Sequence, residues 1–252
     1  MTSSATTLDH VDLIPRDALF GNPERASVQL SPDGRHLSWL APADGVLNIW
    51  VAPAGDPGAA RAITADRARG IRQYFWAYRP DTVLYLRDDA GDEDYHLHAV
   101  DLNTGETLDL TPYPNTTAEV AGLSHRQPEE ILVGMNDRDA QWHDLYRVDL
   151  GTGQRTLVVE NTDGFSGYLA DDDFVIRYGL RTRPDGGADV LIAQGEAWVV
   201  AEDIPFEDVL STYPAGLSTD GQVLYFVDSR GRNTAGLYQV QVETGVRTLV
   251  HE

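Results

Sequence analysis

A repeated unit runs along nearly the whole chain and constrains its fold more than any other feature. Each copy contains an apolar strand, a turn of the Ser-Pro-Asp-Gly kind, two further apolar strands, and a late turn before a last short strand. Four short strands and their turns fill the length of one β-propeller blade. The late turns recur at intervals of 42 to 50 residues, at Gly55, Gly105, Gly153, Gly195 and Gly245.

The segments between the turns favour strands over helices. They are rich in Val, Ile, Leu, Tyr and Trp, and few of them show the 3.6-residue period of a helix. Asp-Gly and Thr-Gly pairs are typical of tight hairpins, because glycine accepts a positive φ without steric cost. We therefore predict an all-β fold, a β-propeller of four-stranded blades with about five blade repeats, as a closed ring or a partial propeller.

The predicted blades leave only a short N-terminal extension. Residues 1–26 form this extension, with a helical turn that starts at Pro15 and stops at Gly21. A partial propeller would expose the strand edges and apolar faces of its end blades, so it predicts self-association through those open edges. The repeat places the blades at about residues 27–66, 71–112, 118–160, 164–203 and 212–252.

Composition excludes several classes of function. The chain carries 19 basic and 40 acidic side chains, a formal charge of −21, which disfavours binding to nucleic acid or to anionic membrane surfaces. It has no cysteine, and therefore no disulfide, thiolate nucleophile or cysteine-ligated metal. It also lacks a signal-peptide core and any run of about eighteen apolar residues. We expect a cytoplasmic protein that binds no nucleic acid and no membrane.

Several segments resemble a known family. The opening at Leu13–Pro23, with Ser31–Gly34 and Leu47–Val51, resembles the amino-terminal propeller of prolyl oligopeptidase family serine peptidases. The acylaminoacyl-peptidase and dipeptidyl-aminopeptidase-like branch is the most similar. Residues Arg87–Leu97 look like the family's Asp-x-x-Gly-x-Glu-Asn segment followed by a strand, with Asp94 in place of the more usual Asn. The resemblance covers essentially all 252 residues.

This resemblance implies a two-domain serine peptidase. Such enzymes pair the propeller with a carboxy-terminal α/β-hydrolase domain, in which a G-x-S-x-G elbow, an Asp and a His form the catalytic triad. The nearest string here, Gly164–Tyr168, lacks the final glycine, and no helix-forming sequence follows Ser166. We expect no catalytic residue in this chain. The implied role is to gate and position short peptides for a hydrolase domain that is absent from it.

One acidic segment is the candidate site. Five carboxylates fall within seven residues, and a solvated hairpin is the simplest interpretation. The resemblance instead places Glu93, flanked by Asp92 and Asp94, at the rim of the substrate cavity. A carboxylate there could pair with an Arg of the catalytic domain or with a substrate amine. The spacing departs from the EF-hand pattern, so we expect no calcium. The five are Asp88, Asp89, Asp92, Glu93 and Asp94.

Other polar and aromatic groups have structural interpretations. His96 and His98 share one face of a strand, but no third ligand follows at a recognisable spacing, so we expect cross-strand packing and no metal or cofactor. Asp171–Asp173 are predicted to form a solvated turn before a strand at Phe174–Tyr178. The five tryptophans are assigned to packing between blades: Trp39, Trp50, Trp76, Trp142 and Trp198.

Two further functions were weighed. A stand-alone propeller could act as a protein-binding or scaffolding module, which requires a closed ring and a partner protein. The segment Leu13–Asn22 argues against it, because a free-standing propeller has no evident use for that segment. A five-bladed glycosidase would need two or three carboxylates converging in a central funnel. The carboxylates of this chain are predicted in turns, which gives that function no support.

Overall fold

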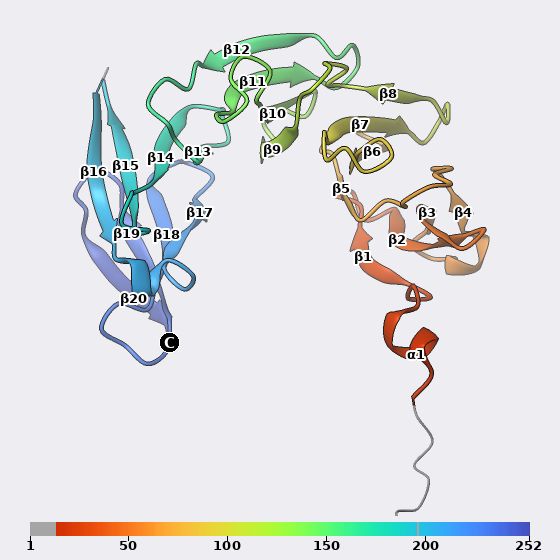
Figure 1. Cartoon of the computed structure of the whole chain (residues 1–252), viewed down its shortest axis with the longest axis horizontal. Helices are drawn as coiled ribbons and strands as arrows, with labels where there is room; N and C mark the ends of the chain where they lie inside the picture. The colour runs from red at the N-terminus through yellow and green to blue at the C-terminus, as the bar shows by residue number, and fades with distance from the viewer. Residues whose placement is uncertain (1–13, 196) are drawn as a thin grey trace, which may run out of the picture. The chain divides into compact units, whose positions relative to one another are not determined.

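A computed structural model describes residues 14–195 and 197–252 of the chain. The strands form five antiparallel sheets of four strands each, and in every sheet the strands are hydrogen-bonded in chain order (Figure 1). These sheets confirm the all-β prediction and the four-stranded blade, and we number them blade 1 to blade 5. Residues 1–13, which belong to the predicted N-terminal extension and include Leu13 of the family-like opening, lie outside the described part.

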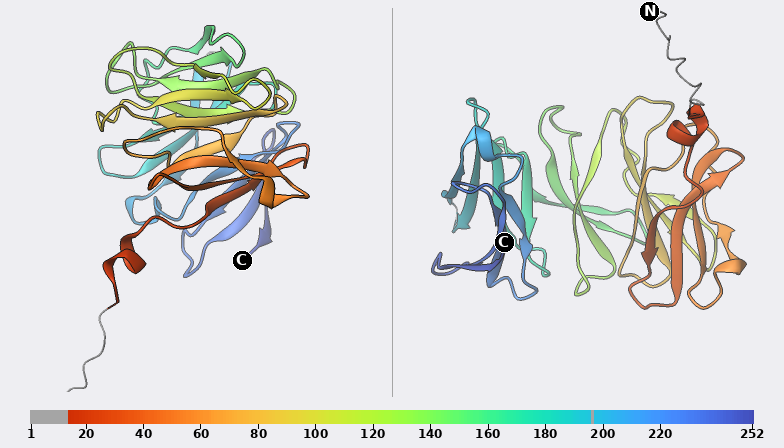
Figure 2. Two further views of the ribbon diagram at one scale, coloured as in Figure 1. Left: turned by 90° about the vertical axis from the view of Figure 1, so that its right-hand side faces the viewer. Right: turned by 90° about the horizontal axis from the view of Figure 1, so that it is seen from below.

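The chain divides into two compact units, the first ending at Ile71 and the second beginning at Arg72. Figure 2 shows the strands of each blade lying side by side.

The first unit holds blade 1: β1 (Ala26–Leu30), β2 (His36–Ala43), β3 (Val46–Pro53) and β4 (Arg61–Ala62). Blade 2 comprises β5 (Gln73–Trp76), β6 (Thr82–Arg87), β7 (His96–Asp101) and β8 (Thr107–Asp109). Blade 3 comprises β9 (Ala118–Leu123), β10 (Glu130–Met135), β11 (Asp144–Asp149) and β12 (Arg155–Val159). Blade 4 comprises β13 (Gly167–Ala170), β14 (Ile176–Thr182), β15 (Ala188–Gln194) and β16 (Ala197–Ile204). Blade 5 comprises β17 (Tyr213–Leu217), β18 (Val223–Asp228), β19 (Gly236–Gln241) and β20 (Arg247–His251).

Helical structure is short throughout the described residues. It consists of the α-helix α1 (Arg16–Phe20) and the 3-10 turns η1 (Pro57–Ala59) and η2 (Phe206–Asp208). None of the helices within residues 14–195 and 197–252 has the length and apolar character needed to cross a membrane.

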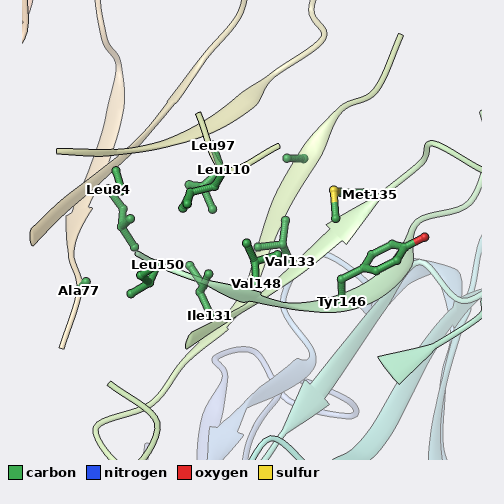
Figure 3. Close-up of a cluster of buried hydrophobic side chains, with 12 residues drawn as sticks. Ala77, Leu84, Leu97, Leu110, Ile131, Val133, Met135, Tyr146, Val148 and Leu150 are labelled. Atoms are coloured by element: carbon green, nitrogen blue, oxygen red, sulfur yellow. The ribbon is translucent and has the colours of Figure 1, made fainter. Parts of the chain in front are cut away.

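The core of the second unit lies between the faces of successive blades. Side chains alternate between the two faces of a strand, so one strand can serve two interfaces. In β10, Ile131 and Val133 pack in a cluster shared with Leu84 and Leu97 of blade 2 (Figure 3). Leu132 packs instead in a cluster with Phe174 of blade 4. Blade 3 is therefore buried on both faces, which is how blades of a propeller pack. A further cluster joins blades 4 and 5 through Tyr178, Val190, Ile204, Leu224, Phe226 and Val240.

Four of the five late turns take the conformation that their glycines predict; Gly55, in blade 1, is not among the residues with positive φ. Gly105, Gly153 and Gly245 have φ of 75°, 70° and 69°. The Gly105 N–H donates to the Asp101 carbonyl at 2.8 Å, and Gly153 bonds Asp149 in the same way at 2.9 Å. Because an L side chain adopts this φ only at a cost, glycine at this position closes the hairpin between the third and fourth strands.

The start of blade 4 differs from the sequence-based prediction. The strand begins at Ile176, and Phe174 lies in a turn with φ of 59°. The solvated turn is wrong for Asp171, which is only 7% exposed. Its carboxylate accepts hydrogen bonds from the Asp173 and Val175 N–H groups at 3.0 and 2.9 Å and from Arg177 Nε at 2.8 Å. These partners explain why a carboxylate can be buried there, and they arise only when the turn folds back.

Candidate functional site

The candidate residues lie in the loop between β6 and β7, residues 88–95, which we call the acidic loop. Arg87 and His96 pair across the strands at its base. Asp92 folds the loop, because its Oδ1 accepts hydrogen bonds from the N–H groups of Asp89 at 3.1 Å and Asp94 at 3.2 Å. The side chain of Asp92 is therefore engaged in the turn, although the residue itself is exposed.

Glu93 combines an unusual backbone conformation with exposure to solvent. Its φ is 64°, in the left-handed region that costs a non-glycine residue about 1–2 kcal/mol. The Thr117 hydroxyl donates to the Glu93 carbonyl at 3.0 Å, and the Ala118 N–H donates to the Tyr95 carbonyl at 2.7 Å. These two bonds attach the acidic loop to the beginning of blade 3. The backbone is thus held while the Glu93 residue is exposed to solvent.

A cavity of about 440 Å³ lies beside this loop. Its lining includes Asp92 and Asp94 but not Glu93, so the structure brings two of the three candidate residues to the cavity wall. The wall is strongly acidic, with Arg87 as its one arginine. Such a surface favours a cationic ligand over an anionic one. The lining residues are Arg87, Asp88, Asp89, Asp92, Asp94, His96, His98, Asp109, Pro114 and Asn115.

The two histidines have different partners. His96 Nδ1 lies 2.8 Å from Asp109 Oδ2, whereas the His98 ring stacks on Tyr85 with centroids 4.9 Å apart and an interplanar angle of 13°. Burial lowers the pKa of His98, which favours the neutral form of the ring. The cross-strand packing predicted for His98 is confirmed. Among the residues that the structure describes, no group of three or more His, Asp or Glu side chains could hold a metal ion.

Some residues of this site escaped sequence reasoning. Asp109 is 13 residues from its partner His96, and Thr117 is 24 residues from Glu93. Asp109 faces His98 in the β7–β8 register, so a hairpin alignment of the two strands would have found it. No sequence pattern predicts the contact of Thr117 with Glu93, because it depends on how the first residues of blade 3 pack on blade 2.

Ser166 does not have the surroundings of a nucleophile. The strand β13 follows it, where a nucleophile elbow requires a helix. Its backbone N–H and hydroxyl both bond the Leu180 carbonyl, at 2.7 and 3.2 Å. The hydroxyl therefore donates to a backbone acceptor on the neighbouring strand β14.

Four-stranded antiparallel blades, repeated in chain order and packed face to face within the second unit, define a protein of the β-propeller class. No protein-family model matches the chain. It is 63% identical over 252 residues to dipeptidyl aminopeptidase BIII of Pseudoxanthomonas mexicana, a match that covers 99% of this chain and 36% of that protein. It is 25% identical over 244 residues to dipeptidyl peptidase family member 6 of Caenorhabditis elegans, covering 90% of this chain and 33% of that protein.

A solved structure agrees with the fold. The β-propeller domain of the trilobed protease from Pyrococcus furiosus superimposes with a TM-score of 0.60 at 17% identity, covering 91% of this chain and 69% of that one. This chain spans about a third of the length of the curated relatives it matches. It has the fold of a β-propeller and is similar in sequence to part of a dipeptidyl aminopeptidase.

Proposed function

We propose that this chain is the propeller portion of a prolyl oligopeptidase family serine peptidase. In this proposal it gates the entry of short peptides and positions them for an α/β-hydrolase domain carried elsewhere in the protein. The observation that carries it is the 63% identity to a dipeptidyl aminopeptidase of which the chain covers only 36%. We also propose that the protein works in the cytoplasm, and that separated chains associate with one another through open blade edges.

The acidic loop supports a positioning role for Glu93. The residue is exposed while its backbone is bonded to Thr117, so a partner of opposite charge would meet it in a restricted place. A peptide with a free amino end carries such a charge, and charge-assisted hydrogen bonds are about twice as strong as neutral ones. The proposed partner is therefore the ammonium group of a short peptide, with an arginine of the hydrolase domain as the alternative.

The test begins with the source gene beyond the codon for Glu252. The proposal expects an open frame that reaches a G-x-S-x-G elbow and then Asp and His. An immediate stop codon would contradict it and leave the protein-binding module as the function.

The whole gene product then tests the role of Glu93 with a dipeptidyl chromogenic substrate and its N-acetylated form. Glu93→Gln is expected to raise KM for the free-amine substrate about tenfold and to change that of the acetylated one little. Glu243→Gln, an exposed glutamate in the late turn of blade 5, is the matched control. Equal behaviour of the two variants would remove Glu93 from substrate positioning.

A further inference from the structure

A second cavity, of about 350 Å³, lies between blades 3 and 4, outside the acidic loop. Its walls come from β9 and β10, from the end of the β10–β11 loop and from the segment that enters β13. Three aromatic side chains, Trp142, Phe165 and Tyr168, line it, and Glu119 is the one lining residue with a permanent charge. Its volume falls at the lower end of the range for small-molecule sites. The remaining lining residues are Val120, Ala121, Gly134, Gln141, His143, Leu145, Ser166 and Gly167.

Two residues that line this cavity carry a side-chain polar atom without a hydrogen-bond partner within the described chain. His143 Nε2 and the Tyr168 hydroxyl are both buried and make no hydrogen bond. His143 Nε2 lies 4.0 Å from Glu119 Oε1, beyond hydrogen-bond distance. Buried polar groups in folded proteins are nearly always bonded, so two such groups on one cavity call for an explanation. A ligand that bonds them provides one.

The walls of the cavity are held in place by buried bonds behind them. Asn161 is only 2% exposed, and its side-chain amide donates to the His143 and Phe165 carbonyls at 3.2 and 2.8 Å. Its Oδ1 also accepts from the Phe165 N–H at 2.9 Å. The buried Asp144 accepts from the Asn161 N–H at 2.7 Å and from Arg138 at 2.6 and 2.7 Å. A cavity built this way is preformed, which reduces the entropic cost of binding.

The aromatic side chains are also positioned by close packing. The Phe165 ring meets those of Tyr168 and Trp198 edge to face, with centroids 5.5 and 4.8 Å apart. Trp142 lies against Gly164, where a Cβ added to the glycine would be 3.2 Å from Cζ2 of the indole. The cavity lining thus combines positioned aromatic rings with charged and polar groups. A ligand with one apolar ring and one polar end matches both.

We propose that this cavity binds a small organic amine that carries an aromatic ring. The protonated nitrogen would lie between Glu119 and His143, because one ammonium can donate to two acceptors 4.0 Å apart at normal distances. The Tyr168 hydroxyl is the third available partner, and the ring packs among Trp142, Phe165 and Tyr168. Aromatic walls also attract cations directly. No lysine or arginine lines the cavity, so nothing there would favour an anion.

This site does not depend on the proposed peptidase role. It includes most of Gly164–Tyr168, the string that resembles a nucleophile elbow without being one, and Trp142, which the sequence assigned to packing. The test therefore uses no peptidase activity. It measures the binding of 2-phenylethylamine to the 252-residue chain by isothermal titration calorimetry at pH 7 and low ionic strength. Two other probes divide the ligand into parts: 2-phenylethanol lacks the charge, and propylamine lacks the ring.

Saturable binding of 2-phenylethylamine is expected, with each of the other probes at least tenfold weaker. Glu119→Gln removes the charge at nearly constant shape and should weaken binding about tenfold, and Tyr168→Phe should weaken it severalfold. Glu243→Gln, an exposed glutamate in the late turn of blade 5, should bind as the unmodified chain does. Circular dichroism melting confirms that each variant is folded.

Three results would overturn the proposal. One is the absence of saturable binding to the folded chain. Another is equal affinity for 2-phenylethanol, which would make the cavity a site for neutral aromatic molecules. The third is loss of affinity in Glu93→Gln with none in Glu119→Gln, which would move the amine to the acidic loop.

Discussion

The Thr117 hydroxyl donates a hydrogen bond of 3.0 Å to the carbonyl of Glu93, and thereby joins the acidic loop of blade 2 to the chain that enters blade 3. The bond stabilises a glutamate in the left-handed region of backbone conformation, which is unfavourable for a residue other than glycine. The position of the Glu93 carboxylate is therefore a property of two blades together.

Removing that bond should loosen the acidic loop. In Thr117→Val we expect faster amide hydrogen exchange over residues 88–95 and a loss of stability of about 0.5–1 kcal/mol, because the bond is near the surface. Exchange in the β18–β19 hairpin of blade 5 serves as the internal control. Unchanged exchange in the acidic loop would show that other contacts hold Glu93.

Replacing Glu93 by glycine should relieve its backbone strain. With φ of 64° at this position, Glu93→Gly is expected to be neutral or to stabilise the chain by up to about 1 kcal/mol. The neighbouring Asp94→Gly should destabilise, since Asp94 is not among the residues with positive φ. Urea unfolding of both variants measures the difference. A clear loss of stability in Glu93→Gly alone would mean that the carboxylate makes a stabilising interaction.

Asn161 should be among the least replaceable polar residues of the second unit. Asn161→Ala breaks three side-chain bonds, two of them buried, and leaves the Phe165 N–H without its acceptor, which we expect to cost about 3 kcal/mol. The exposed Asn103, which bonds Asp81 at 3.3 Å, is the matched control and should cost under about 0.5 kcal/mol on replacement by alanine. Chemical denaturation checks both. Equal costs would contradict the account of the cavity wall.

Replacing Gly164 by alanine should separate the stability cost of backbone strain from the cost of a contact with Trp142. Gly164 and Gly245 have nearly equal φ, 68° and 69°, but a Cβ at Gly245 would meet nothing within 4 Å. Both alanine variants should lose about 1 kcal/mol to strain. Gly164→Ala should lose more, and it should shift the tryptophan emission, because the new Cβ displaces the Trp142 indole. Equal losses of stability in the two variants, with unchanged tryptophan emission, would show that the Trp142 indole moves aside at no measurable cost.

Asp228 should contribute to the acid sensitivity of blade 5. Burial alone would raise its pKa, but Arg230 bonds it at 2.9 and 2.7 Å, and with Arg247 it lowers the pKa to about 2. Because the folded pKa lies below the unfolded value, this contribution is complete above about pH 4 and disappears as the pH falls toward 2. Asp228→Asn should lower stability at pH 7 and flatten the acid-unfolding curve between pH 4 and 2. Glu243→Gln is the control, and an unaltered curve in Asp228→Asn would contradict the prediction.

The repeat, the turns and the strand pattern are local, and they were predictable. The late-turn glycines of blades 2 to 5 have the positive φ that glycine accepts without cost, and the unbroken apolar run Ile131–Met135 is typical of a strand buried on both faces. The family-like segments likewise identified the class of propeller. The predicted candidates Asp92 and Asp94 do reach one cavity, because they lie in a short loop that has few ways to fold.

Contacts between segments that are far apart in the chain could not be predicted from the sequence. The bond between Thr117 and Glu93, the burial of Asp171 and the cavity lined by Trp142, Phe165 and Tyr168 depend on how successive blades meet. Hydrophobic periodicity tells which face of a strand is buried, but it does not tell which side chain will lie opposite. The amino-acid sequence by itself determined the blades of this protein. Only the packing of one blade on the next, set by the complementary shapes of their faces, decided which of its polar and aromatic groups line one cavity.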